Sequence, residues 1–210
     1  MDKTVKALLS EAGRTFAEEA GIELKDQPAA LFKLLVLANL LSSRISADIA
    51  VAAARELFEA GGGTARGMAK LTWQQRVDAL DRAHYVRYDE STSSRLGDMA
   101  ERVLEKYDGD LRKLPLKAER DIGHAKELLQ EFPGIGPAGA DIFCREAQAV
   151  WPWLRPYFDE LTVKGAERLG LPTDPKRLAD LAKERDLAPL AAALVRVAKD
   201  KKLADQVAKG

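Results

Sequence analysis

Residues 128–145, with the sequence LLQEFPGIGPAGADIFCR, contain the residue types and spacing that best fit a ligand-binding role. The segment breaks at Pro133, Gly134 and Gly136. It restarts at Pro137, which suits a first helical turn because it has no N–H to leave unpaired. The two glycines permit positive φ angles and leave backbone N–H groups uncovered. A tight turn leading into a helix N-terminus directs several N–H donors to one place, which predicts an anion site with phosphate as its natural ligand. The alternative is a corner between two helices that binds nothing.

The composition is that of an ordinary globular protein, with 46% hydrophobic residues, 31% charged residues and a formal net charge of +0 over 210 residues. A neutral chain has no overall attraction to polyanions, so phosphate binding must come from a local surface. The single Cys144 excludes an internal disulfide, a cysteine zinc site and a cysteine-ligated iron–sulfur cluster. The longest apolar run, residues 29–41, is too short to span a bilayer. We therefore expect no membrane contact and a cytoplasmic location, with the nucleoid if the source is bacterial.

Nearly every segment has the apolar period of an amphipathic helix, and none alternates with the period of two that a strand requires. We therefore predict an all-α fold. Ser46 is expected to cap one helix, and Thr72 with Gln75 has the spacing of a capping box. Two prolines keep residues 151–157 from forming regular helix. The expected helices span residues 4–20, 28–41, 47–60, 64–70, 73–83, 92–107, 117–131, 137–150, 159–169 and 187–208, with another starting at 172–174.

The FPGIG turn, followed by small residues, a connector and then Asp159 at the head of a helix ending in Arg168-Leu169-Gly170, resembles the helix-hairpin-helix (HhH-GPD) DNA glycosylases. That superfamily includes endonuclease III, the adenine glycosylase and 3-methyladenine glycosylase II. The resemblance covers roughly residues 28–171. It implies one two-lobed helical unit over the whole chain, with a DNA-binding cleft. The lobes would be lobe A, residues 1–27 and 151–210, and lobe B, residues 28–150 ending in the hairpin 117–150.

The resemblance also implies where DNA would bind. Hairpin amides would hold a phosphate near the lesion, and Lys126 could contact another, although a solvated charged face explains that lysine nearly as well. In the family an alkali ion, Na⁺ or K⁺, often bridges this contact through main-chain carbonyls, matched here by those of Gln130, Phe132 and Ile135. We expect no other cofactor, and a monomer bound to double-stranded DNA that contains a lesion. The hairpin residues expected to contact DNA are Gly134, Ile135, Gly136 and Ala138.

Asp159 matches the catalytic aspartate of the family. Cleavage of an N-glycosidic bond builds positive oxocarbenium character on the sugar, and a carboxylate beside C1′ stabilises that charge and can orient an attacking water. An aspartate at a helix start is held in place by capping bonds. The alternative is that Asp159 is an N-cap and nothing more.

The sequence departs from the family pattern in three places. Bifunctional members carry a lysine shortly after the hairpin glycines, whose amine forms a Schiff base with the sugar. Ala138 stands at that position, so we expect no strand cleavage. The cysteine cluster that follows the aspartate in endonuclease III is also absent. The interval from Pro133 to Asp159 is a few residues longer than in the family, because of the aromatic connector.

Base chemistry requires extrusion of the nucleotide from the duplex, so a plug and a base pocket are expected. Arg44 stands where endonuclease III places a gap-filling glutamine, although an exposed loop arginine needs no such role. Tyr85 and Tyr88, in a polar loop, are candidates for stacking on the flipped base. Trp151 and Trp153 are further candidates, with packing under the hairpin as the alternative.

These features predict a base-excision repair enzyme. It would be a monofunctional DNA N-glycosylase that uses Asp159 and water and lacks abasic-site lyase activity. The alternative is a non-catalytic hairpin protein that recognises damaged or bent DNA. A third possibility is a helical interaction protein that keeps only the fold.

Overall fold

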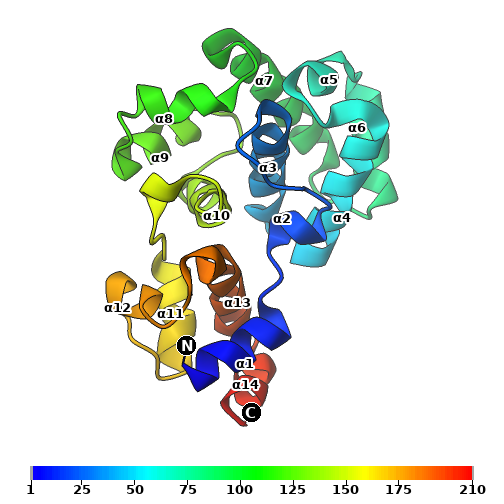
Figure 1. The fold of residues 1–210 in the computed structure, drawn as a ribbon. Coiled ribbons are helices and arrows are strands. Elements are labelled where there is room, and N and C mark those ends of the chain that lie inside the picture. Colours follow the sequence, from blue (N-terminus) through cyan, green and yellow to red (C-terminus); the bar gives the residue numbers. More distant parts are fainter. Residues whose placement is uncertain (1, 210) are drawn as a thin grey trace. The chain divides into compact units, whose positions relative to one another are not determined.

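The computed structural model describes residues 2–209, and every regular element among them is helical (Figure 1). The predicted all-α fold is confirmed. None of the helices in this described range is long and apolar enough to cross a membrane. The chain divides into two compact units: a terminal unit, made of the chain up to Phe16 and from Cys144 onward, and a central unit, Ala17–Phe143.

The unit boundaries follow Phe16 and Phe143, whereas the sequence-based boundaries follow residues 27 and 150. Contacts within the central unit account for the first difference. Arg55 donates from Nε to the carbonyl of Glu19 over 2.7 Å, which holds the segment after Phe16 in the central unit. The helices α2 (Phe16–Glu19) and α10 (Pro137–Ala147) each run across one of the two boundaries in the chain.

The central unit is built around α3 (Pro28–Leu41), whose residues from Ala30 to Leu40 are all buried except Lys33. Helix α3 contacts α4, α4 contacts α6, and α7 packs against both α5 and α6. The predicted Ser46 cap and the Thr72–Gln75 capping box are both present. The remaining elements of this unit are α4 (Ala47–Leu57), a π-helical turn (Phe58–Gly62), α5 (Ala65–Lys70), α6 (Trp73–Arg82), α7 (Asp89–Tyr107), a 3₁₀ turn (Leu111–Lys113), α8 (Leu114–Lys117) and α9 (Ile122–Gln130).

A buried arginine ties three helices of the central unit together. Arg76 of α6 donates from Nε to the carbonyl of Ser93 over 2.9 Å, and from Nη1 to the carbonyls of Met68 and Leu71 over 3.2 and 2.6 Å. Burial lowers the pKa of the Arg76 guanidinium, while Asp98 and Glu101 act in the opposite direction. Three carbonyls accept its hydrogen bonds, and the two nearby carboxylates stabilise its charge, so the buried cation is accommodated.

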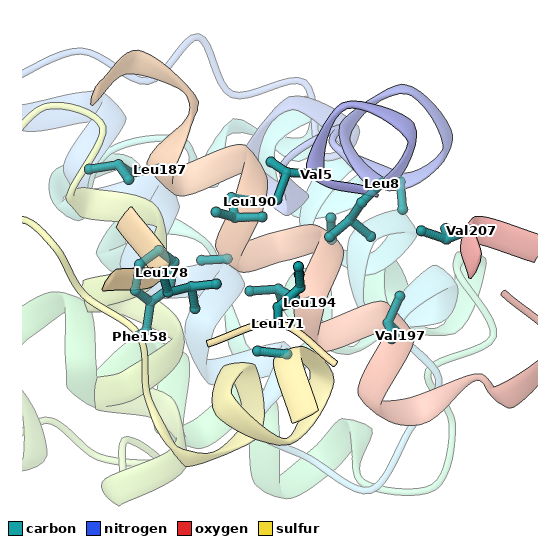
Figure 2. Close-up of a cluster of buried hydrophobic side chains, with 14 of the residues drawn as sticks. Val5, Leu8, Phe158, Leu171, Leu178, Leu187, Leu190, Leu194, Val197 and Val207 are labelled. Carbon is teal, nitrogen blue, oxygen red and sulfur yellow. The ribbon is translucent and has the colours of Figure 1, made fainter. Parts of the chain in front are cut away.

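The terminal unit has α13 (Leu187–Lys199) at its centre, in contact with α1 (Lys3–Ala12), α11 (Glu160–Arg168) and α14 (Lys201–Lys209). Figure 2 shows its apolar core, in which Val5 and Leu8 of α1 meet Leu190 and Leu194 of α13. A methyl group on Gly165 would lie 2.1 Å from the Leu194 carbonyl oxygen, so α11 and α13 touch through their backbones. The other elements are a 3₁₀ turn (Pro152–Leu154), α12 (Pro175–Ala179) and a second 3₁₀ turn (Glu184–Asp186).

Three expected long helices are interrupted, each for a local reason. The helix expected over residues 4–20 stops at Gly13, where a methyl group would lie 2.4 Å from the Leu9 carbonyl oxygen. The one over 117–131 is divided by Glu119 and Arg120, both at positive φ. The one over 187–208 is divided at Asp200, whose carboxylate accepts from the backbone of Lys202 and starts α14. The spacing of apolar residues continues across these breaks, because it reports which face of the chain is buried and not the backbone angles. The sequence pattern therefore did not reveal them.

Candidate nucleic-acid interface

The hairpin joins α9 to α10 through residues 131–136. Asp121 caps α9 by accepting from the His124 N–H over 2.8 Å. The Ile135 N–H donates to the Phe132 carbonyl over 3.0 Å and closes the turn. The N–H groups of Gly134 and Gly136 enter no backbone hydrogen bond within the described residues. Two donors therefore stay open at the point where α10 begins, whereas the predicted contact Ile135 uses its N–H inside the turn and buries its side chain.

The turn is anchored to the central helix α3 by one buried polar side chain. Asn39 is 3% exposed and donates from Nδ2 to the Pro133 carbonyl over 3.0 Å. Gly134 lies directly against this amide, since a methyl group there would come within 2.4 Å of Nδ2. Its φ of +82° also lies in the left-handed region that favours glycine. The turn therefore has little freedom to change shape without displacing Asn39.

A cavity of about 430 Å³ opens beside the turn and brings several predicted residues together. Arg44, Tyr88 and Ala138 line it with the two hairpin glycines, as do three residues that the sequence reading missed: Ser42, Ser43 and Arg95. Arg44 and Arg95 are exposed, and Tyr88 is half-buried. Two guanidinium groups and open N–H donors beside one aromatic ring form a surface suited to a phosphate backbone with an unstacked base.

Two other predicted residues lie elsewhere in the central unit. The ring of Tyr85 is fully buried, and its hydroxyl pairs with Ser43 Oγ at 2.9 Å and Thr92 Oγ1 at 3.2 Å. Tyr85 therefore holds the 42–44 loop through Ser43 and is not exposed for stacking on a base. Lys126 pairs with Asp141 at 2.7 Å across the hairpin helices, which reduces its availability for a phosphate.

Asp159 lies in the terminal unit as the N-cap of α11. Its Oδ1 accepts from the Thr162 N–H over 3.2 Å, and its Oδ2 accepts from Arg145 Nη1 over 2.5 Å. The side chains of Arg145 and Asp159 are 7% and 10% exposed. The sequence reading missed Arg145 because nothing in its spacing marks it as a partner of Asp159. The carboxylate is held in one orientation by two partners.

The connector that precedes Asp159 is held by a buried amide. Gln148 donates from Nε2 to the Tyr157 carbonyl and accepts on Oε1 from the Tyr157 N–H, both over 3.0 Å. Trp151 is 4% exposed and stacks on Trp153, with ring centroids 5.7 Å apart. Trp151 is therefore a core residue, and Trp153 is half-buried against it.

The described residues contain no group of three or more histidine, cysteine, aspartate or glutamate side chains that could hold a metal ion. An alkali ion at the hairpin would instead use carbonyls. That of Phe132 already accepts from the Ile135 N–H and has one further lone pair to offer. The ion site at Gln130, Phe132 and Ile135 stays a prediction.

No protein-family model matches the chain, and no curated protein matches it. Among solved structures it is similar to a non-covalent endonuclease III–DNA complex, with 16% identity and a TM-score of 0.50, covering 93% of this chain and 85% of that one. The chain has an endonuclease III-like fold. A trapped covalent endonuclease III–DNA intermediate, an estranged-adenine complex, matches over the same shares with 15% identity and a TM-score of 0.49. At these identities the likeness concerns the fold alone.

Proposed function

We propose that this protein binds damaged double-stranded DNA and removes a base from it by hydrolysis of the N-glycosidic bond, without cutting the strand. The observation that carries the DNA-binding part is the cavity beside the hairpin, where Arg44 and Tyr88 meet the open N–H groups of Gly134 and Gly136. The endonuclease III-like fold supports the choice of DNA as the partner. Because the net charge of the chain is +0, this local surface must supply the attraction to phosphate.

In this proposal Asp159 supplies the catalytic carboxylate. Its hydrogen bonds to Thr162 and Arg145 hold it in place before substrate binds, which suits a group that must stabilise a transient positive charge on the sugar. Ala138 has no amine, so the sugar cannot form a Schiff base at that position. The expected products are a free base and an abasic site in an intact strand.

One observation favours a second candidate, a non-catalytic protein that only recognises damaged or bent DNA. Both carboxylate oxygens of Asp159 already have partners, Oδ1 with Thr162 and Oδ2 with Arg145. A carboxylate engaged in this way has less capacity to orient a water or to face a sugar. In this reading the Arg145–Asp159 pair is a structural ion pair at the start of α11.

Base release from a panel of alkylated, oxidised, deaminated and mispaired duplexes separates the two candidates. The glycosylase proposal expects release from at least one duplex by the wild type, and none by Asp159→Asn, with duplex affinity retained by both. Asp174→Asn is the matched control, since Asp174 caps α12 in the same unit by accepting from the Arg177 N–H over 2.9 Å. It should keep full activity.

Asp159→Asn leaves the Arg145 charge buried without its partner, a change that typically destabilises by about 3–5 kcal/mol. The double variant Arg145→Met with Asp159→Asn removes both charges and guards against loss of fold. Base release by that folded double variant at the wild-type rate would exclude Asp159 from the chemistry. Salt-dependent duplex binding by a wild type that releases no base from any duplex would favour the second candidate.

A further inference from the structure

Arg95, in the first half of α7, lines the hairpin cavity but has no assigned part in the proposed function. It is exposed, and in the described part of the chain its guanidinium forms no hydrogen bond or ion pair. Neighbouring cations on the hairpin side of α7 are engaged: Arg102 donates to the Glu131 carbonyl, and Lys106 pairs with the Glu131 carboxylate. Arg95 therefore keeps its full capacity to bind an anion.

The stem of Arg95 is fixed against the hairpin turn. A methyl group on Gly134 would lie 3.3 Å from Cδ of Arg95, so the stem packs on the glycine backbone. The same methyl group would lie 2.4 Å from Nδ2 of Asn39, so both side chains meet Gly134 where a side chain would otherwise start. This contact at Cδ places the guanidinium beside the turn, which lowers the entropic cost of ordering the side chain on an anion.

Two cavities meet at this arginine. Arg44 and Tyr88 line the cavity of about 430 Å³, and Arg102 and Gln130 line a second one of about 540 Å³. Arg95, Gly134 and Gly136 line both. A chain of phosphates that passes the hairpin amides would therefore meet Arg95 whether it continues into one cavity or the other.

We infer that Arg95 binds a backbone phosphate adjacent to the one held by the Gly134 and Gly136 amides, and so extends the DNA contact from the hairpin onto α7. This inference rests on the proposed DNA binding. A guanidinium offers paired donors that match two phosphate oxygens. Contacts of this kind set the position of the strand and carry no base preference.

The test measures duplex affinity of the full chain, for a duplex containing a stable abasic-site analogue, across a series of salt concentrations. Each phosphate contact contributes about 0.9 to the slope of log affinity against log salt. Raising the salt concentration from 50 to 200 mM weakens duplex binding. The factor by which binding weakens should be about 3.5 times smaller for Arg95→Gln than for the wild type. Arg95→Lys keeps the charge and should keep the slope.

Arg112→Gln is the matched control, because it removes the same charge from an exposed arginine of the same unit that pairs with Asp110 and lines neither cavity. Its slope should equal that of the wild type. A set of duplexes, each with one neutral methylphosphonate linkage, locates the contact. One linkage should weaken the wild type and leave Arg95→Gln unaffected.

The inference is overturned if Arg95→Gln has the same salt slope as the wild type and every methylphosphonate linkage weakens both proteins equally. That result would leave DNA binding by the wild type intact. Equal effects of Arg95→Gln and Arg112→Gln would also overturn it, since the effect would then be one of net charge. A wild type without salt-dependent duplex binding would refute the proposed function together with this inference.

Discussion

Replacing Gly134 with alanine should destabilise the hairpin turn through two effects, backbone strain and a clash with Asn39. At a φ of +82° an alanine costs about 1–2 kcal/mol more than glycine. The new methyl group would lie 2.4 Å from Nδ2 of Asn39 and would force that amide off the Pro133 carbonyl. Loss of this hydrogen bond adds about 1 kcal/mol. The expected total is about 2–3 kcal/mol, or a fall in Tm of about 4–12 °C.

Thermal and urea unfolding of Gly134→Ala and Gly136→Ala provide the measurement and its control. Gly136 is two residues away, its φ is not positive, and a methyl group there would meet nothing within 4 Å. Its replacement should change the free energy of unfolding by no more than about 0.5 kcal/mol. Because Gly136 lines both cavities, the same variant should still weaken duplex binding.

The double variant with Asn39→Ala isolates the steric part of the effect. Without the amide, Gly134→Ala should cost only the backbone term, so the two changes should be coupled by about 1 kcal/mol. If Gly134→Ala lowers the free energy of unfolding equally with and without Asn39, the predicted clash between the new methyl group and the Asn39 amide is refuted. A Gly134→Ala protein as stable as the wild type would refute the whole argument for the turn.

Three further changes have defined outcomes. Ala138→Lys places an amine in the hairpin cavity and should allow borohydride trapping on abasic DNA, which the wild type should not show; trapping of the wild type would contradict the monofunctional proposal. Arg76→Met leaves three carbonyls without their donor and should lower the free energy of unfolding in urea by about 2–4 kcal/mol, and a neutral result would mean that water replaces the guanidinium. Thr72→Ala removes one half of the capping box with Gln75 and should cost about 1 kcal/mol in the same assay, and an unchanged free energy of unfolding would contradict this.

Local sequence signals predicted the parts of this protein that depend on neighbouring residues. The all-α fold, the Ser46 and Thr72 caps and the FPGIG turn each arise from contacts within a few positions in the chain. The interruptions at Gly13 and at Glu119 and Arg120 were missed because apolar period continues across them.

The rest of the site depends on contacts that sequence spacing does not report. Tyr85 and Tyr88 are three residues apart in the same polar loop, yet one is fully buried and the other lines the cavity. Asn39 and Pro133 are 94 positions apart, so their hydrogen bond has no local signature. Arg95 likewise reads as one more surface cation on an amphipathic helix until its neighbours are known.

The single buried side-chain amide on α3 helps to fix the rotation of this helix about its axis within the central unit. In a helix that is apolar on most sides, the apolar residues alone specify the rotation about the axis only weakly. Asn39 removes that degeneracy, because only one rotational setting brings its amide to the Pro133 carbonyl. Any other setting would leave a polar group stranded in the core. The hydrogen bond to the hairpin turn thereby favours one packing of the central helix over others that would bury a similar apolar area.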